Sequence, residues 1–159
     1  MNITVISVGK IKEKFYTEAI AEYSKRLSRY CSLKIIEVDD EKTPDKASDA
    51  LNASIMKKEA EAIYKCIPKD SYVIVLAIEG KKNDSVGFSN HLNSLAVNGH
   101  SNLVFIIGGS LGIDADLKKK SNELISFSDM TFPHQLMRVI LLEQIYRSFK
   151  INNNEPYHK

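Results

Sequence analysis

The sequence predicts an α/β fold, a parallel sheet with helices on both faces. Apolar, β-branched runs alternate about five times with longer segments of helical periodicity. The run at residues 71–78 is apolar at successive positions, which is typical of a strand buried on both faces of a parallel sheet. No linker, repeat or low-complexity segment interrupts the 159 residues, so we expect a single domain over residues 1–159.

The first half of the chain predicts two strands and two helices. Residues 3–8 and 33–38 are the β-branched runs that we expect as strands. Between them, apolar side chains recur close to helical spacing at Phe15, Ala19, Tyr23, Leu27 and Tyr30. Thr43-Pro44 offers an N-cap and a proline at the first helical position. The second helix should therefore begin there, with its core side chains at Leu51, Ile55, Ile63 and Ile67.

The second half continues the alternation after the strand at residues 71–78. Ser85 is a candidate cap for a helix that Gly99 closes, and residues 102–107 predict a fourth strand. Asp114 can start a short polar helix, and residues 124–127 predict a fifth strand. An apolar helix should then run from about Pro133 to Phe149.

Composition is ordinary, with 43% hydrophobic and 26% charged residues and a formal net charge of +2. No apolar run is long enough to span a bilayer, and the start does not resemble a signal peptide, so we expect a cytoplasmic protein without a membrane partner. The two cysteines, Cys31 and Cys66, lie too far apart in the sequence for metal-ligand spacing, so we expect reduced thiols and no metal site. Basic clusters, among them residues 10–14, 81–82 and 118–120, are either solvated faces or contacts to a phosphate backbone.

Residues 104–112, VFIIGGSLG, hold the first candidate site. A strand ends at Gly108 and Gly109, and Gly112 follows. Glycines allow positive φ and close approach of another group, and ligands bind at the carboxyl ends of strands in open α/β sheets. The spacing matches neither a phosphate loop nor a dinucleotide fingerprint. A ligand loop and a tight turn without a ligand remain equally open.

Two further segments carry candidate residues. In residues 127–138, FSDMTFPHQLMR, His134 and Arg138 are four apart and share a helical face. A surface histidine is the alternative. The last residues, PYHK, place Tyr157 and His158 where a frayed terminus is usually polar, which suggests a tail that docks.

Together these three segments resemble the RlmH family of SPOUT methyltransferases, over the whole chain. The shared motifs are the "VGK" at residues 8–10, the "IGG…G" loop, "PHQLMR" and the terminal "PYHK". The resemblance implies a C-terminal trefoil knot, which chain topology alone would argue against. It also implies a homodimer with the site near the subunit interface. Ser110-Leu111 departs from the Pro-Glu that relatives often carry, and we assign those two residues no role.

The activity that the resemblance implies is methylation of N3 of a pseudouridine in large-subunit (23S) ribosomal RNA within the ribosome. The implied cofactor is S-adenosyl-L-methionine. Its implied pocket comprises Leu76, Ile107, Gly108, Gly109, Gly112, Phe127, Ser128, Asp129, Met130, Thr131 and Phe132.

The implied catalytic residues are His158, Tyr157, Arg138 and His134. His158 is the first candidate for general base or base-orienter, since histidine titrates near neutral pH. Tyr157 could stack on the target base, and Arg138 and His134 could hold a phosphate or the uracil oxygens. Two alternatives are a non-catalytic ribosome-binding or assembly factor with this fold and a flavodoxin-like nucleotide-binding module.

Overall fold

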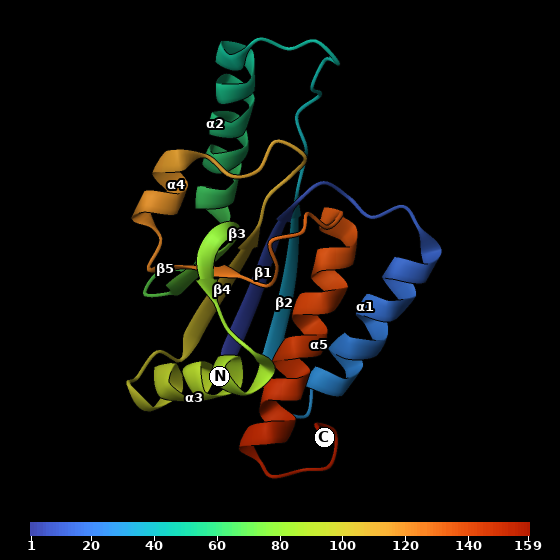
Figure 1. The fold of residues 1–159 in the computed structure, drawn as a ribbon, viewed down its shortest axis with the longest axis vertical. Helices are drawn as coiled ribbons and strands as arrows, with labels where there is room; N and C mark the ends of the chain where they lie inside the picture. Colours follow the sequence, from blue (N-terminus) through green and yellow to red (C-terminus); the bar gives the residue numbers. More distant parts are fainter.

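The computed structural model describes residues 1–159 and contains one sheet (Figure 1). Its strands are β1 (Asn2–Val8), β2 (Ser32–Val38), β3 (Tyr72–Lys82), β4 (Asn102–Ile107) and β5 (Glu123–Ser126). They lie in the order β2-β1-β4-β3-β5, and every neighbouring pair is parallel. The predicted fold class is therefore confirmed, and all carboxyl ends of the strands meet at one edge of the sheet.

Helices cover both faces of the sheet, as predicted. They are α1 (Lys14–Leu27), α2 (Asp49–Cys66), α3 (Ser85–Val97), α4 (Ala115–Lys120) and α5 (His134–Asn152). One hydrophobic cluster joins the sheet to α1, α3 and α5, and a second joins its other face to α2 and α4. Apolar side chains from both faces of β1, β3 and β4 enter these clusters, which accounts for the continuous apolar runs in those strands.

The predicted start of the second helix is wrong. It begins at Asp49, where the Ser48 hydroxyl accepts a hydrogen bond from the backbone N–H of Leu51. Thr43-Pro44 offered a candidate cap and a proline compatible with the first helical turn, but the cap hydrogen bond is made five residues later by Ser48, and Asp49 in the first turn suits the positive end of the helix dipole. The third helix is likewise capped by Asp84, with Ser85 as its first residue.

The third strand is longer than the predicted 71–78. After an irregularity between Leu76 and Lys81, the chain pairs again with β5 and ends at Lys82. Gly80 lies in this irregular stretch, where an added Cβ would stand 2.6 Å from the backbone of Ile125. Only glycine permits such a close approach of the two backbones. The close approach lets the end of β3 pair with β5 a second time, at the carboxyl edge of the sheet.

The segment between β5 and α5, residues 127–133, connects one edge of the sheet to the helix over its middle. Figure 1 shows it passing across the carboxyl ends of β3 and β4 before α5 begins. This path puts the FSDMTFP segment beside the glycine loop. The trefoil knot implied by the resemblance stays a prediction.

The structure has no helix with the length and apolar character to cross a membrane. Cys31 and Cys66 are both free, as predicted.

Candidate active site

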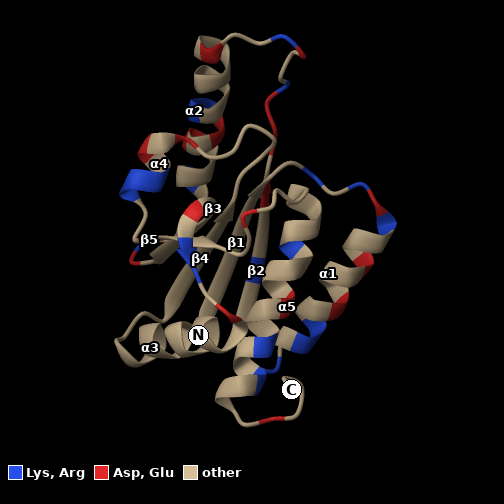
Figure 2. Ribbon diagram, in the orientation of Figure 1, with Lys and Arg blue, Asp and Glu red and all other residues tan.

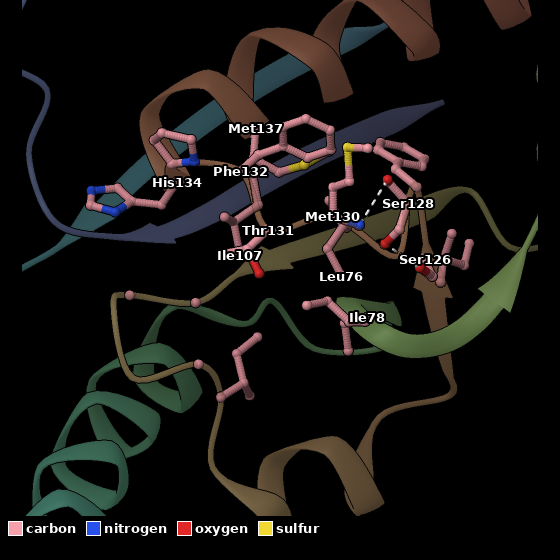
Figure 3. Close-up of a pocket in the computed structure, with 18 of the residues that line it drawn as sticks. Leu76, Ile78, Ile107, Ser126, Ser128, Met130, Thr131, Phe132, His134 and Met137 are labelled. Carbon is pink, nitrogen blue, oxygen red and sulfur yellow. Dashed lines mark hydrogen bonds between the residues drawn. The ribbon is translucent and has the colours of Figure 1, made fainter.

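A cavity of about 700 Å³ opens at the carboxyl edge of the sheet. Figure 3 shows side chains from β3, β4, the segment before α5 and the start of α5 pointing into it. Its apolar lining includes Leu76, Ile78, Ile107, Met130 and Met137. A largely apolar cavity of this size suits a small-molecule ligand or cofactor.

The glycine loop forms one wall of the cavity as a tight turn. The Gly112 N–H donates to the Gly109 carbonyl at 3.1 Å, and Gly112 has a φ of +89°. A Cβ on Gly108 would stand 2.5 Å from Cγ1 of Ile113 and 2.8 Å from the Gly112 carbonyl oxygen. The loop is thus closed on itself so tightly that position 108 admits no side chain.

The opposite wall is the segment that precedes α5, and its turn is held by its own side chains. The Ser126 hydroxyl donates to the Ser128 carbonyl at 3.1 Å, and the Met130 N–H donates to the Ser128 hydroxyl at 2.9 Å. Such local side-chain bonds fix a turn where no helix or sheet does so. They hold backbone groups facing the cavity in one arrangement.

Of the predicted cofactor residues, the structure brings all but one to this cavity. Asp129 does not line it, and its carboxylate pairs with Lys82 at the end of β3 instead. The residues brought together are Leu76, Ile107, Gly108, Gly109, Gly112, Phe127, Ser128, Met130, Thr131 and Phe132. The sequence reading missed Ile78, Glu79 and Lys118, which also line the cavity.

Glu79 is the only carboxylate in the lining, and Lys118 of α4 contacts it at 2.6 Å. The hydrogen bond from Lys118 holds the pKa of Glu79 below its usual value, with a bond to the backbone adding to the effect. The carboxylate is therefore charged at neutral pH and forms an ion pair with Lys118 at the rim.

His134 lies at the first position of α5 and also lines the cavity. Its Nε2 would be 3.0 Å from a Cβ on Gly9, which has a φ of +86°, so the glycine after β1 leaves room for the ring. Burial lowers the pKa of His134, and the nearby charge of Arg138 lowers it further, although Asp40 and Glu13 oppose them. The ring is therefore neutral at neutral pH, and it has an acceptor nitrogen.

The lowered pKa of His134 predicts a loss of stability in mild acid. The unfolded chain binds a proton near pH 6.5 and the folded chain only at lower pH, so stability is lost as pH falls from about 6.5 through the folded pKa. His134→Gln removes this proton uptake. Urea unfolding at about pH 7.5 and about pH 5.5 should show a smaller loss in the variant than in the unaltered chain. Equal losses would contradict the assignment.

Arg138 does not reach the cavity. Its side chain is 1% exposed, and it donates to Glu37 of β2 and to the carbonyls of Val8 and Gly9 at the end of β1. Burial lowers the pKa of Arg138, and the Glu37 carboxylate opposes this effect. Within this chain the guanidinium has no free face toward a phosphate or a uracil oxygen. It ties the start of α5 to the carboxyl ends of β1 and β2.

Arg138→Leu is expected to destabilise the chain by about 3–5 kcal/mol, since it removes one member of a buried pair and leaves carbonyls unpaired. Arg26→Leu is the control: Arg26 also pairs with a glutamate, Glu22, but on the surface of α1, where such pairs contribute little. Denaturant unfolding followed by circular dichroism measures both. A loss at Arg138 no larger than at Arg26 would contradict the structural role.

The predicted tail residues lie far from the cavity of their own chain. His134 begins α5, whereas the tail folds back along the helix to Glu143 and Arg147, which lie about 14 and 20 Å further along its axis. Figure 1 shows the C-terminus at the opposite end of α5 from the carboxyl edge of the sheet. The chain therefore does not bring Tyr157 and His158 together with His134.

The tail is docked, as the sequence suggested, on the end of α5. The Tyr157 hydroxyl donates to Glu143 at 3.0 Å, and the Arg147 guanidinium lies 4.7 Å from the centre of the Tyr157 ring. Burial raises the pKa of Tyr157, with hydrogen bonds to Tyr23 and Glu143 adding to it. The sequence analysis missed Glu143 and Arg147, although their spacing of four on the last helix signals an ion pair.

Figure 2 shows where the charged residues lie along the ribbon, and only some of the lysines and arginines in the basic clusters have acidic partners. Ion pairs engage Lys10, Lys14, Lys58, Lys82 and Lys118. No ion pair engages Lys12, Lys81, Lys119 or Lys120. Lys81 belongs to β3, and Lys119 and Lys120 belong to α4, two elements that contribute residues to the cavity lining. No group of three or more His, Cys, Asp or Glu side chains is placed to hold a metal.

The chain combines a parallel α/β sheet with a cavity between a glycine turn and the segment before the last helix. The family model described as "Predicted SPOUT methyltransferase" matches residues 1–158. The chain therefore belongs to the SPOUT methyltransferase family.

Full-length relatives specify the family further and confirm the resemblance to RlmH. A Bifidobacterium adolescentis protein named "Ribosomal RNA large subunit methyltransferase H" is 60% identical over 159 residues, all of both chains. A Methanococcus vannielii protein named "Putative ribosomal RNA large subunit methyltransferase H" is 59% identical over the same span. The solved structure of a probable methylase family protein from Haemophilus influenzae shares the fold, with a TM-score of 0.56 at 12% identity, covering 99% of this chain and 70% of that one.

Proposed function

We propose that this protein transfers a methyl group from S-adenosyl-L-methionine to N3 of a pseudouridine in large-subunit ribosomal RNA. The cavity at the carboxyl edge of the sheet carries the proposal, because it joins two of the three segments on which the family resemblance rests, the glycine loop and the segment before α5. The names of the full-length relatives support the same substrate class.

The cavity residues fit the cofactor. The walls are apolar, Gly108 leaves no room for a side chain of its own, and backbone groups around Ser128 are available for hydrogen bonds. These features suit a bent molecule with an adenine ring. The Glu79 carboxylate on the rim, paired with Lys118, would accept hydrogen bonds from polar groups of the cofactor. Leu76, Ile107 and Met130 would hold the adenine through their main chains and side chains. When bound, the cofactor supplies a methyl group on a positively charged sulfur.

The nucleic-acid side of the reaction falls to the tail and the basic residues. N3–H of a uracil ring is weakly acidic, so the site must stabilise the charge that develops as the proton leaves. Tyr157 would stack on the ring, and His158 would act on its polar edge. His134, neutral and beside the cavity, would contact the base or its phosphate. Lys81, Lys119 and Lys120 would bind RNA phosphates.

A second copy of the chain completes the site in this proposal. The tail of one copy cannot bind at its own cavity while it is docked on Glu143 and Arg147, about 14 and 20 Å along α5 from His134. In a homodimer with α5 at the interface, the tail of one protomer would lie at the cavity of the other. Two-fold symmetry then gives two identical composite sites.

Mass spectrometry of large-subunit RNA from cells that lack the gene tests the function. We expect one pseudouridine to lose a methyl group, and the purified protein with the cofactor to restore it on ribosomes from those cells. Calorimetry with S-adenosyl-L-methionine separates the alternatives. A chain that binds ribosomes but not the cofactor would be an assembly factor, and a chain that copurifies with a flavin or nucleotide would be a different module.

A further inference from the structure

The tail histidine is held by a side chain that can only donate. Nη1 of Arg147 lies 3.3 Å from Nδ1 of His158. A guanidinium carries N–H groups and no acceptor atom, so Nδ1 of the histidine must accept in this hydrogen bond. A neutral imidazole that accepts at Nδ1 carries its one proton at Nε2.

Arg147 is itself fixed in place by Glu143, one turn earlier on α5. Its Nε and Nη2 donate to Oε1 of Glu143 at 3.1 and 2.6 Å, which leaves Nη1 for the tail. The Tyr157 hydroxyl donates to the same oxygen at 3.0 Å, and Gln144 donates to the other at 2.6 Å. Each of the hydrogen bonds that link Glu143, Arg147, Tyr157 and His158 has one possible direction, because the carboxylate only accepts and the guanidinium only donates.

We propose that Glu143 and Arg147 are positioning residues that hold His158 as the Nε2–H tautomer, and that this N–H donates a hydrogen bond to a carbonyl oxygen of the target uracil ring. The proposal rests on the proposed function and assigns His158 the role of a donor. Of the two roles that the sequence suggested for His158, this proposal keeps that of orienting the target base and replaces that of general base.

The chemistry of the ring favours a donor at this place. N3 lies between two carbonyl groups, and loss of its proton spreads negative charge onto both oxygens. An N–H already aimed at one of them stabilises that charge as it develops. The N3 proton goes to solvent water, because Nε2 of His158 already holds a proton and Nδ1 is occupied by Arg147.

His158→Gln and His158→Ala distinguish donor from base. The glutamine amide donates from nearly the position of Nε2 but takes up no proton near neutral pH. In single-turnover methylation with saturating cofactor, we expect His158→Gln to stay within about tenfold of the unaltered protein and His158→Ala to fall by about 10²–10³-fold. Equal losses in both variants would overturn the donor role.

Arg147→Gln tests the positioning, with Arg26→Gln as the matched control. Arg26 also pairs with a glutamate four residues away and lies over tyrosine rings, but it does not contact His158. Nitrogen NMR of the His158 ring should show only the Nε2–H tautomer in the unaltered protein and in Arg26→Gln, and a mixture in Arg147→Gln. The methylation rate of Arg147→Gln should fall by up to about 10²-fold at unchanged cofactor affinity.

The NMR measurement separates this inference from the proposed function. It uses the full-length protein without substrate, so an unaltered protein that methylates no RNA would refute the function without touching the tautomer. An Nδ1–H ring in the unaltered protein would overturn the inference whatever the activity, as would an Arg147→Gln variant with an unchanged ring and an unchanged rate.

Discussion

Gly108→Ala is expected to weaken binding of S-adenosyl-L-methionine by about 10²-fold and to leave the chain folded. The new methyl group would meet the side chain of Ile113 and the Gly112 carbonyl at 2.5 and 2.8 Å, so the turn must open into the cavity. Overpacking of a fitted site costs about 1–3 kcal/mol, and about 1.4 kcal/mol is a factor of ten in affinity. Calorimetry measures the affinity, and circular dichroism reports the fold.

Gly99→Ala is the control for the general cost of replacing a glycine. Gly99 closes α3 with a φ of +88°, away from the cavity, and nothing lies within 4 Å of an added Cβ. Its replacement should reduce stability through backbone strain but leave cofactor affinity unchanged. Should Gly108→Ala bind the cofactor as tightly as Gly99→Ala, the glycine loop would be only a turn and the proposed pocket would be wrong.

The location of the cavity could be predicted because the signals for it are local. Apolar runs mark the strands, and in a parallel sheet their carboxyl ends share an edge. The residues that follow β4 and β5 are therefore neighbours in space, although 126 is far from 108 in the sequence. That argument predicts the glycine loop as a ligand site, whereas the 127–132 segment was implied by the family resemblance; of that segment only Asp129, which pairs with Lys82, does not line the cavity.

Arg138 illustrates what a helical pattern leaves undetermined. Its spacing from His134 places both residues on one helical face, but the spacing does not say which one is buried. The guanidinium pairs with Glu37, which lies 101 residues earlier, because the fold brings the start of α5 to the carboxyl ends of β1 and β2. A long-range partner of this kind has no signal in a single sequence, so the helical spacing alone does not predict that Arg138 is buried.

The tail shows the same limit at the scale of the whole fold. The residue types of the last four positions suggested docking, and the tail does dock on α5. Where it docks depends on the length and direction of α5, which carry Tyr157 and His158 away from the cavity of their own chain. The composite site therefore becomes a question about a second copy of the chain, and a mixture of two defective variants can answer it.

A mixture of Gly108→Ala and His158→Ala protein is expected to methylate ribosomal RNA although neither variant does so well alone. Each homodimer lacks one half of both sites. In a mixed dimer, the intact cavity of the His158→Ala protomer meets the intact tail of the Gly108→Ala protomer, so one site is complete. After random subunit exchange, half of the dimers are mixed, and the expected rate is about a quarter of that of the unaltered protein.

The control mixture combines His158→Ala with Tyr157→Ala, where every dimer has two defective tails and the rate should stay low. If each tail served the cavity of its own chain, the first mixture would contain no complete site either. Its rate would then equal the average of the two variants, and the shared site would be refuted. The comparison depends on which chain supplies the tail and on nothing else, because both mixtures contain the same His158→Ala protomer with an unaltered cavity.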